Sequence, residues 1–228
     1  MTFGLVLLTN TAVYAQEIQT LALGFSRTVI DGVSIDSTEG QLAFKAPDEV
    51  YIHVQDPIEQ WMVFYADKVL IYYPQDRKAF ELTSENSRSV PFFEAFIGSV
   101  KDDFGLSELG FSITDHKITN DTLITIWRPG EDVSGLIGNF TLSYYDNKIV
   151  FTEAKDSEGK TITEAYYSNH IRYKNSYFPL KTRIISYHSR GTTVEDINYQ
   201  DPKFNEDLPP AVQSFKIPSD IETKRIEF

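Results

Sequence analysis

One stretch decides the fold: Gly40-Gln41-Leu42-Ala43-Phe44-Lys45-Ala46-Pro47, followed by strand-length apolar runs up to Pro74. In residues 50–54, Val-Tyr-Ile-His-Val, every second residue is aliphatic, which is the period of a strand with one buried face. Residues 61–65 and 69–73 are apolar on both faces. Strands of that kind are covered on both sides, or one of their faces borders a cavity that apolar matter fills.

The composition is that of a folded domain without disulfide cross-links. The 228 residues include no cysteine, which excludes disulfide scaffolds, thiolate metal sites and cysteine nucleophiles. The formal net charge of −12 argues against nucleic acid and against anionic lipid headgroups as partners. A chain of this length removes roughly 70–75% of its unfolded surface from water, so a large core is available.

The only long apolar run lies at the N-terminus. It begins at Phe3 and is too short to span a bilayer. Because it is followed by the small-residue site Val13-Tyr14-Ala15, we interpret residues 1–15 as a signal peptide that lacks its basic n-region. Residues 16–228 are then a single exported domain. The alternative is an N-terminal helix that packs on the sheet.

Turn residues divide the chain into strands. Asp31-Gly32 predicts a hairpin between residues 20–30 and 33–44, and similar turns recur beyond Gly110. A nearly continuous antiparallel meander with one inserted helix is the simplest arrangement. We expect the proline-rich C-terminal segment to cross the sheet surface, with Phe204 and Phe215 as anchors.

The inserted helix is predicted between Pro91 and Phe104. A proline in the first turn, Lys101 near the end and Gly105 just beyond are typical start and stop residues. The apolar positions follow helical spacing: Phe92, Phe93, Phe96, Ile97, Val100 and Phe104. This phenylalanine-rich helix has two interpretations. Either it packs an ordinary large core, or it is the lid of a curved sheet whose concave face holds a lipid.

No catalytic motif is present. The sequence has no nucleophile elbow, phosphate-binding glycine loop, zinc-protease helix or EF-hand loop. No carboxylate pair is singled out for glycoside hydrolysis. Four histidines lie far apart on predicted strands, where we interpret each as a surface or hydrogen-bonded residue: His53, His116, His170 and His188. We therefore expect no catalytic residue, no metal, no cofactor and no enzymatic activity.

The order of several short motifs resembles the LolA-like periplasmic lipoprotein carriers. The motifs cover most of the mature chain: residues 40–47, Gln55-Asp56-Pro57, Ala66-Asp67-Lys68, Ile71-Tyr72-Tyr73-Pro74, the helix start Val90-Pro91-Phe92-Phe93 and the closing Phe215-Lys216-Ile217-Pro218. The family has an arginine where this chain has Ala46, a position that helps to control cargo transfer in the family. We expect this protein to differ from the carriers there.

The resemblance implies a mainly β fold, a single strongly curved antiparallel sheet that forms an open half-barrel with a helical lid. It implies a monomeric periplasmic protein that carries the acyl chains of lipoproteins or other lipids towards the outer membrane. An inner-membrane release complex and an outer-membrane acceptor are the implied partners, without stable membrane insertion. The predicted cavity and lid residues are Leu42, Phe44, Val50, Ile52, Val54, Trp61, Val63, Ile71, Tyr73, Phe92, Phe93, Phe96 and Ile97.

Two other functions remain open. The first is a non-catalytic envelope sensor or binding module for lipids or lipoproteins on the same fold. The second is a hydrolase built on a β scaffold. In the carrier hypothesis, the aromatic residues of the helix occupy the concave face when the protein is empty and swing aside when lipid enters.

Overall fold

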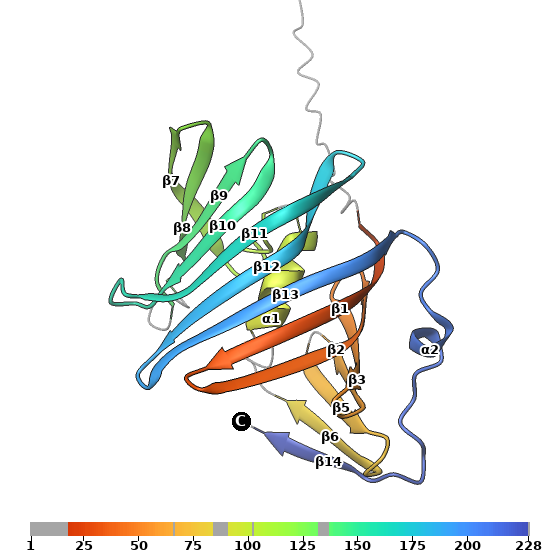
Figure 1. Cartoon of the computed structure of the whole chain (residues 1–228). Coiled ribbons are helices and arrows are strands. Elements are labelled where there is room, and N and C mark those ends of the chain that lie inside the picture. Colours follow the sequence, from red (N-terminus) through yellow and green to blue (C-terminus); the bar gives the residue numbers. More distant parts are fainter. Residues whose placement is uncertain (1–17, 66, 84–90, 102, 132–136, 228) are drawn as a thin grey trace, which may run out of the picture.

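A single sheet of fourteen strands makes up most of the chain (Figure 1). The computed structural model describes residues 18–65, 67–83, 91–101, 103–131 and 137–227. From edge to edge the strands follow the order β14-β6-β5-β4-β3-β2-β1-β13-β12-β11-β10-β9-β8-β7. The strands are β1 (Thr20–Asp31), β2 (Ser34–Lys45), β3 (Glu49–Asp56), β4 (Gln60–Phe64), β5 (Lys68–Tyr73), β6 (Lys78–Thr83), β7 (Phe111–Thr119), β8 (Thr122–Pro129), β9 (Phe140–Tyr145), β10 (Lys148–Lys155), β11 (Thr161–Tyr173), β12 (Ser176–His188), β13 (Gly191–Phe204) and β14 (Thr223–Glu227).

Tight turns join neighbouring strands, as the sequence predicts. The β1–β2 hairpin turns at Gly32, whose φ is 59°, and Leu23 lies opposite Leu42 in this pair. Asn120 and Asp121 turn between β7 and β8 with φ values of 49° and 60°. Glycine, asparagine and aspartate tolerate this left-handed backbone, which two-residue hairpin loops require. The prediction of a meander is therefore confirmed.

The chain returns to its own beginning in the middle of the sheet. β1 pairs with β13, for example with Phe25 opposite Tyr199, so the two meanders β1–β6 and β7–β13 become one sheet. The sheet does not close into a barrel, because β14 and β7 are its two edges. The predicted open, curved sheet is confirmed.

Two elements differ from the prediction. Helix α1 (Pro91–Val100) ends at Val100 instead of Phe104. The chain leaves the helix after Val100, and Phe104 and Gly105 have left-handed φ values of 60° and 73°, so the helix does not extend through Phe104. At the C-terminus, β14 pairs parallel with β6, so the sheet is not wholly antiparallel.

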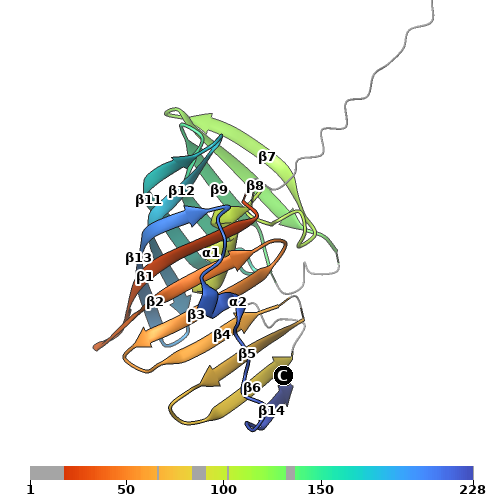
Figure 2. The same cartoon turned by 90° about the vertical axis from the view of Figure 1, so that its right-hand side faces the viewer.

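The two faces of the sheet carry different helices. Figures 1 and 2 show that the sheet curves around α1, whereas the short helix α2 (Pro210–Gln213) lies on the opposite side. We call these sides the inner face and the outer face. The inner-face cluster consists of the buried residues Ile18, Leu21, Leu23, Phe25, Leu42, Phe44, Val50, Ile52, Val54, Phe64, Val69, Ala95, Phe96, Val100, Leu106, Phe111, Trp127, Leu142, Ile149, Ala165, Tyr167, Phe178, Ile184, Ile197 and Tyr199. The outer-face cluster consists of Ala43, Trp61, Leu208 and Val212.

The C-terminal segment covers part of the outer face, as expected. Phe215 packs on Trp61 with the two ring centroids 4.9 Å apart. Phe204, the second expected anchor, is instead the last residue of β13 and packs against the inner-face cluster. The expectation was wrong for Phe204 because β13 continues past Pro202 to the point where Phe204 stacks on Tyr173.

Candidate functional site

Helix α1 lies against the centre of the inner face through Phe96. This side chain is 0% exposed. Its ring centroid lies 6.4 Å from that of Phe44, 6.3 Å from that of Phe178 and 6.0 Å from that of Tyr199, all in edge-to-face geometry. These three aromatic residues come from β2, β12 and β13. One helix side chain therefore joins both halves of the sheet.

Most of the predicted wall residues lie on this inner face. Five of them belong to the buried inner-face cluster: Leu42, Phe44, Val50, Ile52 and Val54. Ile71 packs against the cluster and is partly buried. Tyr73 lies two residues further along β5 and so on the same side, with its ring 6.3 Å from that of Phe80. The structure thus brings seven of the predicted residues together on one surface.

Two predicted wall residues lie on the other side. Trp61 belongs to the outer-face cluster, and Val63 is the cross-strand neighbour of Tyr51, which packs against that cluster. The inward residues of β4 are Met62 and Phe64, which lie opposite Ile52 and Val50. The assignment of Trp61 and Val63 to the cavity is corrected. Because both faces of β4 are apolar, alternation alone could not tell which face was the inner one.

The predicted lid residues have different outcomes. Ile97 packs against the inner-face cluster and is partly buried, next to the central Phe96. The side chains of Phe92 and Phe93 lie outside the described part of the structure. The expected signal peptide, residues 1–15, also lies outside the described residues.

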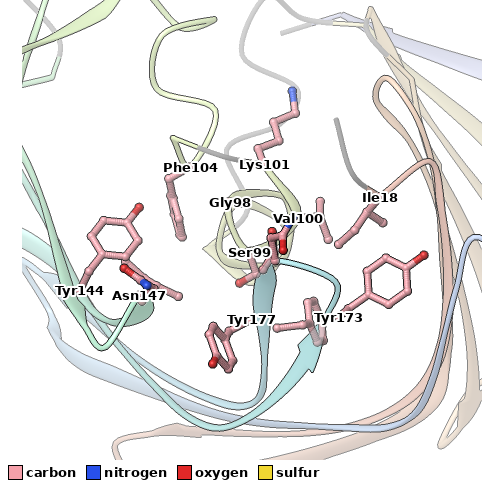
Figure 3. Close-up of a pocket in the computed structure, with 14 residues that line it drawn as sticks. Ile18, Gly98, Ser99, Val100, Lys101, Phe104, Tyr144, Asn147, Tyr173 and Tyr177 are labelled. Atoms are coloured by element: carbon pink, nitrogen blue, oxygen red, sulfur yellow. The ribbon is translucent and has the colours of Figure 1, made fainter. Parts of the chain in front are cut away.

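A pocket remains beside the C-terminal end of α1 (Figure 3). Its volume is about 140 Å³. Figure 3 shows α1 end-on, with Phe104 and Tyr144 on one side of the pocket and Ile18 and Tyr173 on the other. The pocket is also lined by polar groups at the strand turns, among them Asn147.

Lys101 fastens the end of α1 to the sheet. Its side chain is 8% exposed, and its ammonium donates to the carboxylate of Asp48 at 2.9 Å and to that of Glu108. Burial lowers the pKa of Lys101, but the hydrogen bonds to Glu108 and Asp48 outweigh it, so the pKa is raised overall. The helix end is thus held by a charged tether.

Phe104 fixes the chain direction after the helix. A Cβ atom on Gly98 would meet the Phe104 ring at 2.2 Å, so only glycine allows this ring to fold back onto α1. Phe104 then reaches Phe140 and Tyr167, with ring centroids 5.9 Å apart in both pairs. The turn after α1 is therefore packed on β9 and β11.

Sequence reasoning missed the aromatic residues of the second half. Phe178, Tyr167 and Tyr199 are each at most 4% exposed and face α1 or the turn that follows it. Burial, together with Tyr167 and Glu195 nearby, raises the pKa of Tyr199, so its phenol stays protonated. Phe178 and Leu180 are two residues apart on β12, and this spacing could have identified an inward face. It could not have shown how close that face lies to the helix.

No site for metal chemistry is found in the described residues. No group of three or more His, Cys, Asp or Glu side chains there is placed to hold a metal ion. His53 lies on the outer face, stacked on Trp61 with the ring centroids 4.1 Å apart, and His170 bonds to the Ile149 carbonyl oxygen at 2.7 Å. None of the helices within the described ranges is long and apolar enough to cross a membrane.

A second pocket lies on the outer face, with a volume of about 340 Å³. Trp61 and His53 line it, together with Val212 from α2. Exposed polar residues, including Gln41 and Lys203, lie at its border.

The chain is similar in structure to several solved proteins. A domain described as an outer membrane lipoprotein-sorting protein domain from Vibrio parahaemolyticus aligns with a TM-score of 0.64 and 13% identity, covering 86% of this chain and 89% of that chain. A DUF1329 family protein from Desulfovibrio piger aligns with a TM-score of 0.67 and 9% identity, covering 90% and 92%. The LolA superfamily protein NE2245 from Nitrosomonas europaea aligns with a TM-score of 0.62 and 13% identity, covering 85% and 89%.

No protein-family model matches the chain, and no curated protein matches its sequence. The structural likeness extends over most of both partners in each comparison, at identities too low to carry more than the fold. The resemblance expected from the sequence motifs is therefore confirmed at the level of architecture: this chain has the fold of the LolA-like, lipoprotein-sorting structures.

Proposed function

We propose that this protein is a non-catalytic lipid carrier of the bacterial envelope. Residues 16–228 act as one unit, whose inner face binds the acyl chains of lipoproteins or other lipids. The observation that carries the proposal is the burial of Phe96 of α1 against Phe44 and Phe178 on the curved sheet. An apolar surface covered by one short helix becomes a binding surface when the helix moves.

The small volume of the pocket beside α1 means that the helix must move before a long acyl chain can bind. The pocket beside α1 measures about 140 Å³. Sites for small ligands are usually about 300–1,000 Å³, and an engineered apolar cavity of about 150 Å³ holds a benzene molecule. A long acyl chain therefore fits on the inner face only if α1, and Phe96 with it, is displaced.

The free energy of acyl-chain burial favours a helix that covers the binding surface when no lipid is bound. Each buried methylene contributes about 0.8 kcal/mol, so a long acyl chain gains roughly 10 kcal/mol on desolvation. A carrier with an exposed empty cavity would not release such a cargo. Because Phe96 covers the same surface in the empty protein, lipid and helix compete, and the net affinity falls to a value that allows transfer.

The carrier and the sensor differ in the step after binding. A carrier delivers its cargo, so depletion of the protein should leave outer-membrane lipoproteins mislocalised. A sensor or binding module would bind lipid without changing their distribution. The hydrolase alternative has no supporting observation among the described residues and would require turnover of an ester or glycoside.

Crosslinking α1 to the sheet tests the proposal. The chain has no native cysteine, so Asp48→Cys and Lys101→Cys introduce the only two thiols. The Lys101 ammonium lies 2.9 Å from an Asp48 carboxylate oxygen, so a short bismaleimide can join the two positions. Uptake of a fluorescent fatty-acyl probe should be nearly abolished after crosslinking.

The same double variant without crosslinker is the matched control, and it should bind the probe at least as fast as the native protein. Circular dichroism before and after crosslinking checks that the sheet is retained. Unchanged uptake by the crosslinked protein would contradict a moving lid. Organic extraction of the purified chain should also release lipid; a lipid-free protein that ignores acyl probes would contradict the carrier function.

A further inference from the structure

The pocket on the outer face is larger than the pocket beside α1. Its volume is about 340 Å³, against about 140 Å³ for the pocket beside the helix. Small-molecule sites usually measure about 300–1,000 Å³. The C-terminal segment bounds the outer pocket, because Pro209 and Val212 are among its lining residues. Figures 1 and 2 show α2 on the side of the sheet opposite α1, so this pocket is separate from the surface that α1 covers.

Small residues form the floor of the outer pocket. Ala22 and Gly24 of β1 and Ala43 of β2 line it, and Ala22 lies opposite Ala43 in the strand register. Leu23, the residue between Ala22 and Gly24, belongs to the inner-face cluster, so its two neighbours face outwards. Because these three positions carry no long side chain, there is room above β1 and β2, which lie between β3 and β13.

Aromatic side chains form one wall of the pocket and already stack on one another. The Trp61 ring centroid lies 4.9 Å from that of Phe215 and 4.1 Å from that of His53, whose ring plane is within 11° of the indole plane. Within the described residues, no ring other than that of Trp61 stacks on His53. On the next strands, Gln41 lies opposite His53, and Gly24 lies opposite Gln41. The row of rings therefore ends at His53, beside the open floor.

The border of the pocket offers no surplus positive charge to an anionic ligand. Asp201 and Lys203 of β13 both line the pocket, and their formal charges cancel. On the opposite side, His53 Nε2 lies 3.2 Å from a Glu59 carboxylate oxygen. The amide of Gln41 both donates and accepts hydrogen bonds. These groups suit an uncharged ligand with a polar substituent.

We propose that the outer pocket binds an uncharged planar aromatic molecule of two or three fused rings. The ring system stacks on the face of His53 that Trp61 leaves open and lies over Ala22, Gly24 and Ala43. Aromatic stacking adds to the burial of apolar area, so a flat ring system is preferred to a saturated one of similar size. A cavity of about 150 Å³ holds one benzene molecule, and the larger volume here admits fused rings. The site is independent of the proposed lipid binding, because it uses the other face of the sheet.

Binding of 2-naphthol, measured by isothermal titration calorimetry, tests the inference. Its matched partner is decahydro-2-naphthol, which has the same carbon skeleton and hydroxyl group but no aromatic ring. The native protein should bind 2-naphthol about fivefold more tightly, the advantage expected of one aromatic contact. The anion 2-naphthoate should bind more weakly than 2-naphthol. The Hε1 proton of His53 should shift upfield in the NMR spectrum on binding, because the naphthol ring lies over the imidazole.

Gly24→Leu should fill the pocket from its floor. A Cβ atom on Gly24 would lie 3.7 Å from the Gln200 Cβ atom, an ordinary contact, so the variant should fold. Its affinity for 2-naphthol should fall at least tenfold. The matched control is Ser26→Leu, which changes the same face of β1 outside the pocket lining and should bind like the native protein. His53→Leu removes the stacking partner and should abolish the preference for 2-naphthol over its saturated partner.

Circular dichroism establishes that each variant is folded. Equal or tighter binding of the saturated compound by the native protein, or unchanged affinity in folded Gly24→Leu, would overturn the inference. If Gly24→Leu does not fold, an unchanged preference in His53→Leu overturns it.

A fluorescent fatty-acyl probe separates this site from the inner face. 2-Naphthol in the outer pocket should leave the acyl probe bound, and the protein with α1 crosslinked to the sheet should still bind 2-naphthol. Loss of 2-naphthol binding on crosslinking would place the compound on the inner face, which overturns this inference while the lipid-binding proposal stands. Failure of the acyl probe to bind, with 2-naphthol binding intact, would have the opposite meaning.

Discussion

The inner and outer faces of the sheet are both covered by short helical segments, but in different ways. On the inner face, α1 places Phe96 at the meeting point of β2, β12 and β13. On the outer face, α2 and the residues after it lie over Trp61 at one part of the sheet. Helix α1 therefore packs at the centre of the core. Helix α2 and the residues after it cover only the small outer-face cluster.

The polar groups of the two faces differ as well. Three buried hydroxyls that lack partners in the described chain lie on the inner face, those of Thr182, Ser186 and Tyr199. On the outer face, His53 both stacks on Trp61 and places its Nε2 atom 3.2 Å from a Glu59 carboxylate oxygen, so this ring nitrogen has a partner. The comparison teaches that the central helix contact and the unpartnered hydroxyls of the described chain belong to the inner face, whereas the outer face carries a small aromatic patch beside a pocket of about 340 Å³.

The largest effect is expected from Phe96→Ala. The substitution should lower the free energy of unfolding by about 3–5 kcal/mol, because it leaves a cavity at the centre of the inner face. Urea denaturation measures the loss. An acyl probe should restore part of the stability by filling the cavity. No restoration at saturating probe would contradict lipid binding at this position.

Trp61→Ala gives the corresponding change on the outer face. We expect a loss of about 3 kcal/mol, at the lower end of the range for large aromatic residues, because the C-terminal segment can settle into the space. Probe uptake should be unchanged, and added probe should not restore stability. If uptake is lost in a variant that is still folded at the assay temperature, the binding site lies in the outer pocket beside Trp61 instead.

Lys101→Met should weaken the tether of α1 with a smaller loss of stability. We expect about 1–2 kcal/mol, because Glu108 and Asp48 can be hydrated once the ammonium is absent. Stopped-flow uptake of the acyl probe should become faster. The control is Lys148→Met, which removes a lysine ion-paired with Asp146 in the β9–β10 turn and should leave the rate unchanged.

The pH dependence of the tether follows from the raised pKa of Lys101. Its stabilising contribution is fully present below the unfolded lysine pKa of about 10.4 and is lost as pH rises through the folded value. Native uptake should therefore accelerate at strongly alkaline pH, and uptake by the Lys101→Met variant should not. Equal acceleration in both proteins would assign the effect to another group.

The smallest effect is expected at His170 on β11. Burial lowers its pKa, against the effect of its bond to the Ile149 carbonyl oxygen, so the folded state favours the neutral ring. The stability gained is present above the unfolded histidine pKa of about 6.5 and is lost as the pH falls towards the folded value. His170→Gln should reduce the loss of stability between pH 7 and pH 5. Equal acid sensitivity in the native protein and in the variant would contradict this role.

Much of the fold could be predicted because its determinants are local. Asp31-Gly32 and Asn120-Asp121 encode left-handed turns, and the apolar spacing after Pro91 encodes a helix. The course of the chain after that helix could not be predicted, since the Phe104 ring folds back onto Gly98. The helix α2 and the strand β14 were missed because neither has a periodic pattern long enough to detect.

The sequence by itself determined that this is a curved, mainly antiparallel sheet with strands apolar on both faces and one phenylalanine-rich helix. Only the tertiary structure decided which face is the inner one, so that Met62 and Phe64 point to α1 and Trp61 does not. A period of two shows that neighbouring residues lie on opposite faces, but it does not show which face is the inner one. The inner face is decided by contacts between residues far apart in the chain, such as the pairing of β1 with β13 and the packing of Phe96 against Tyr199.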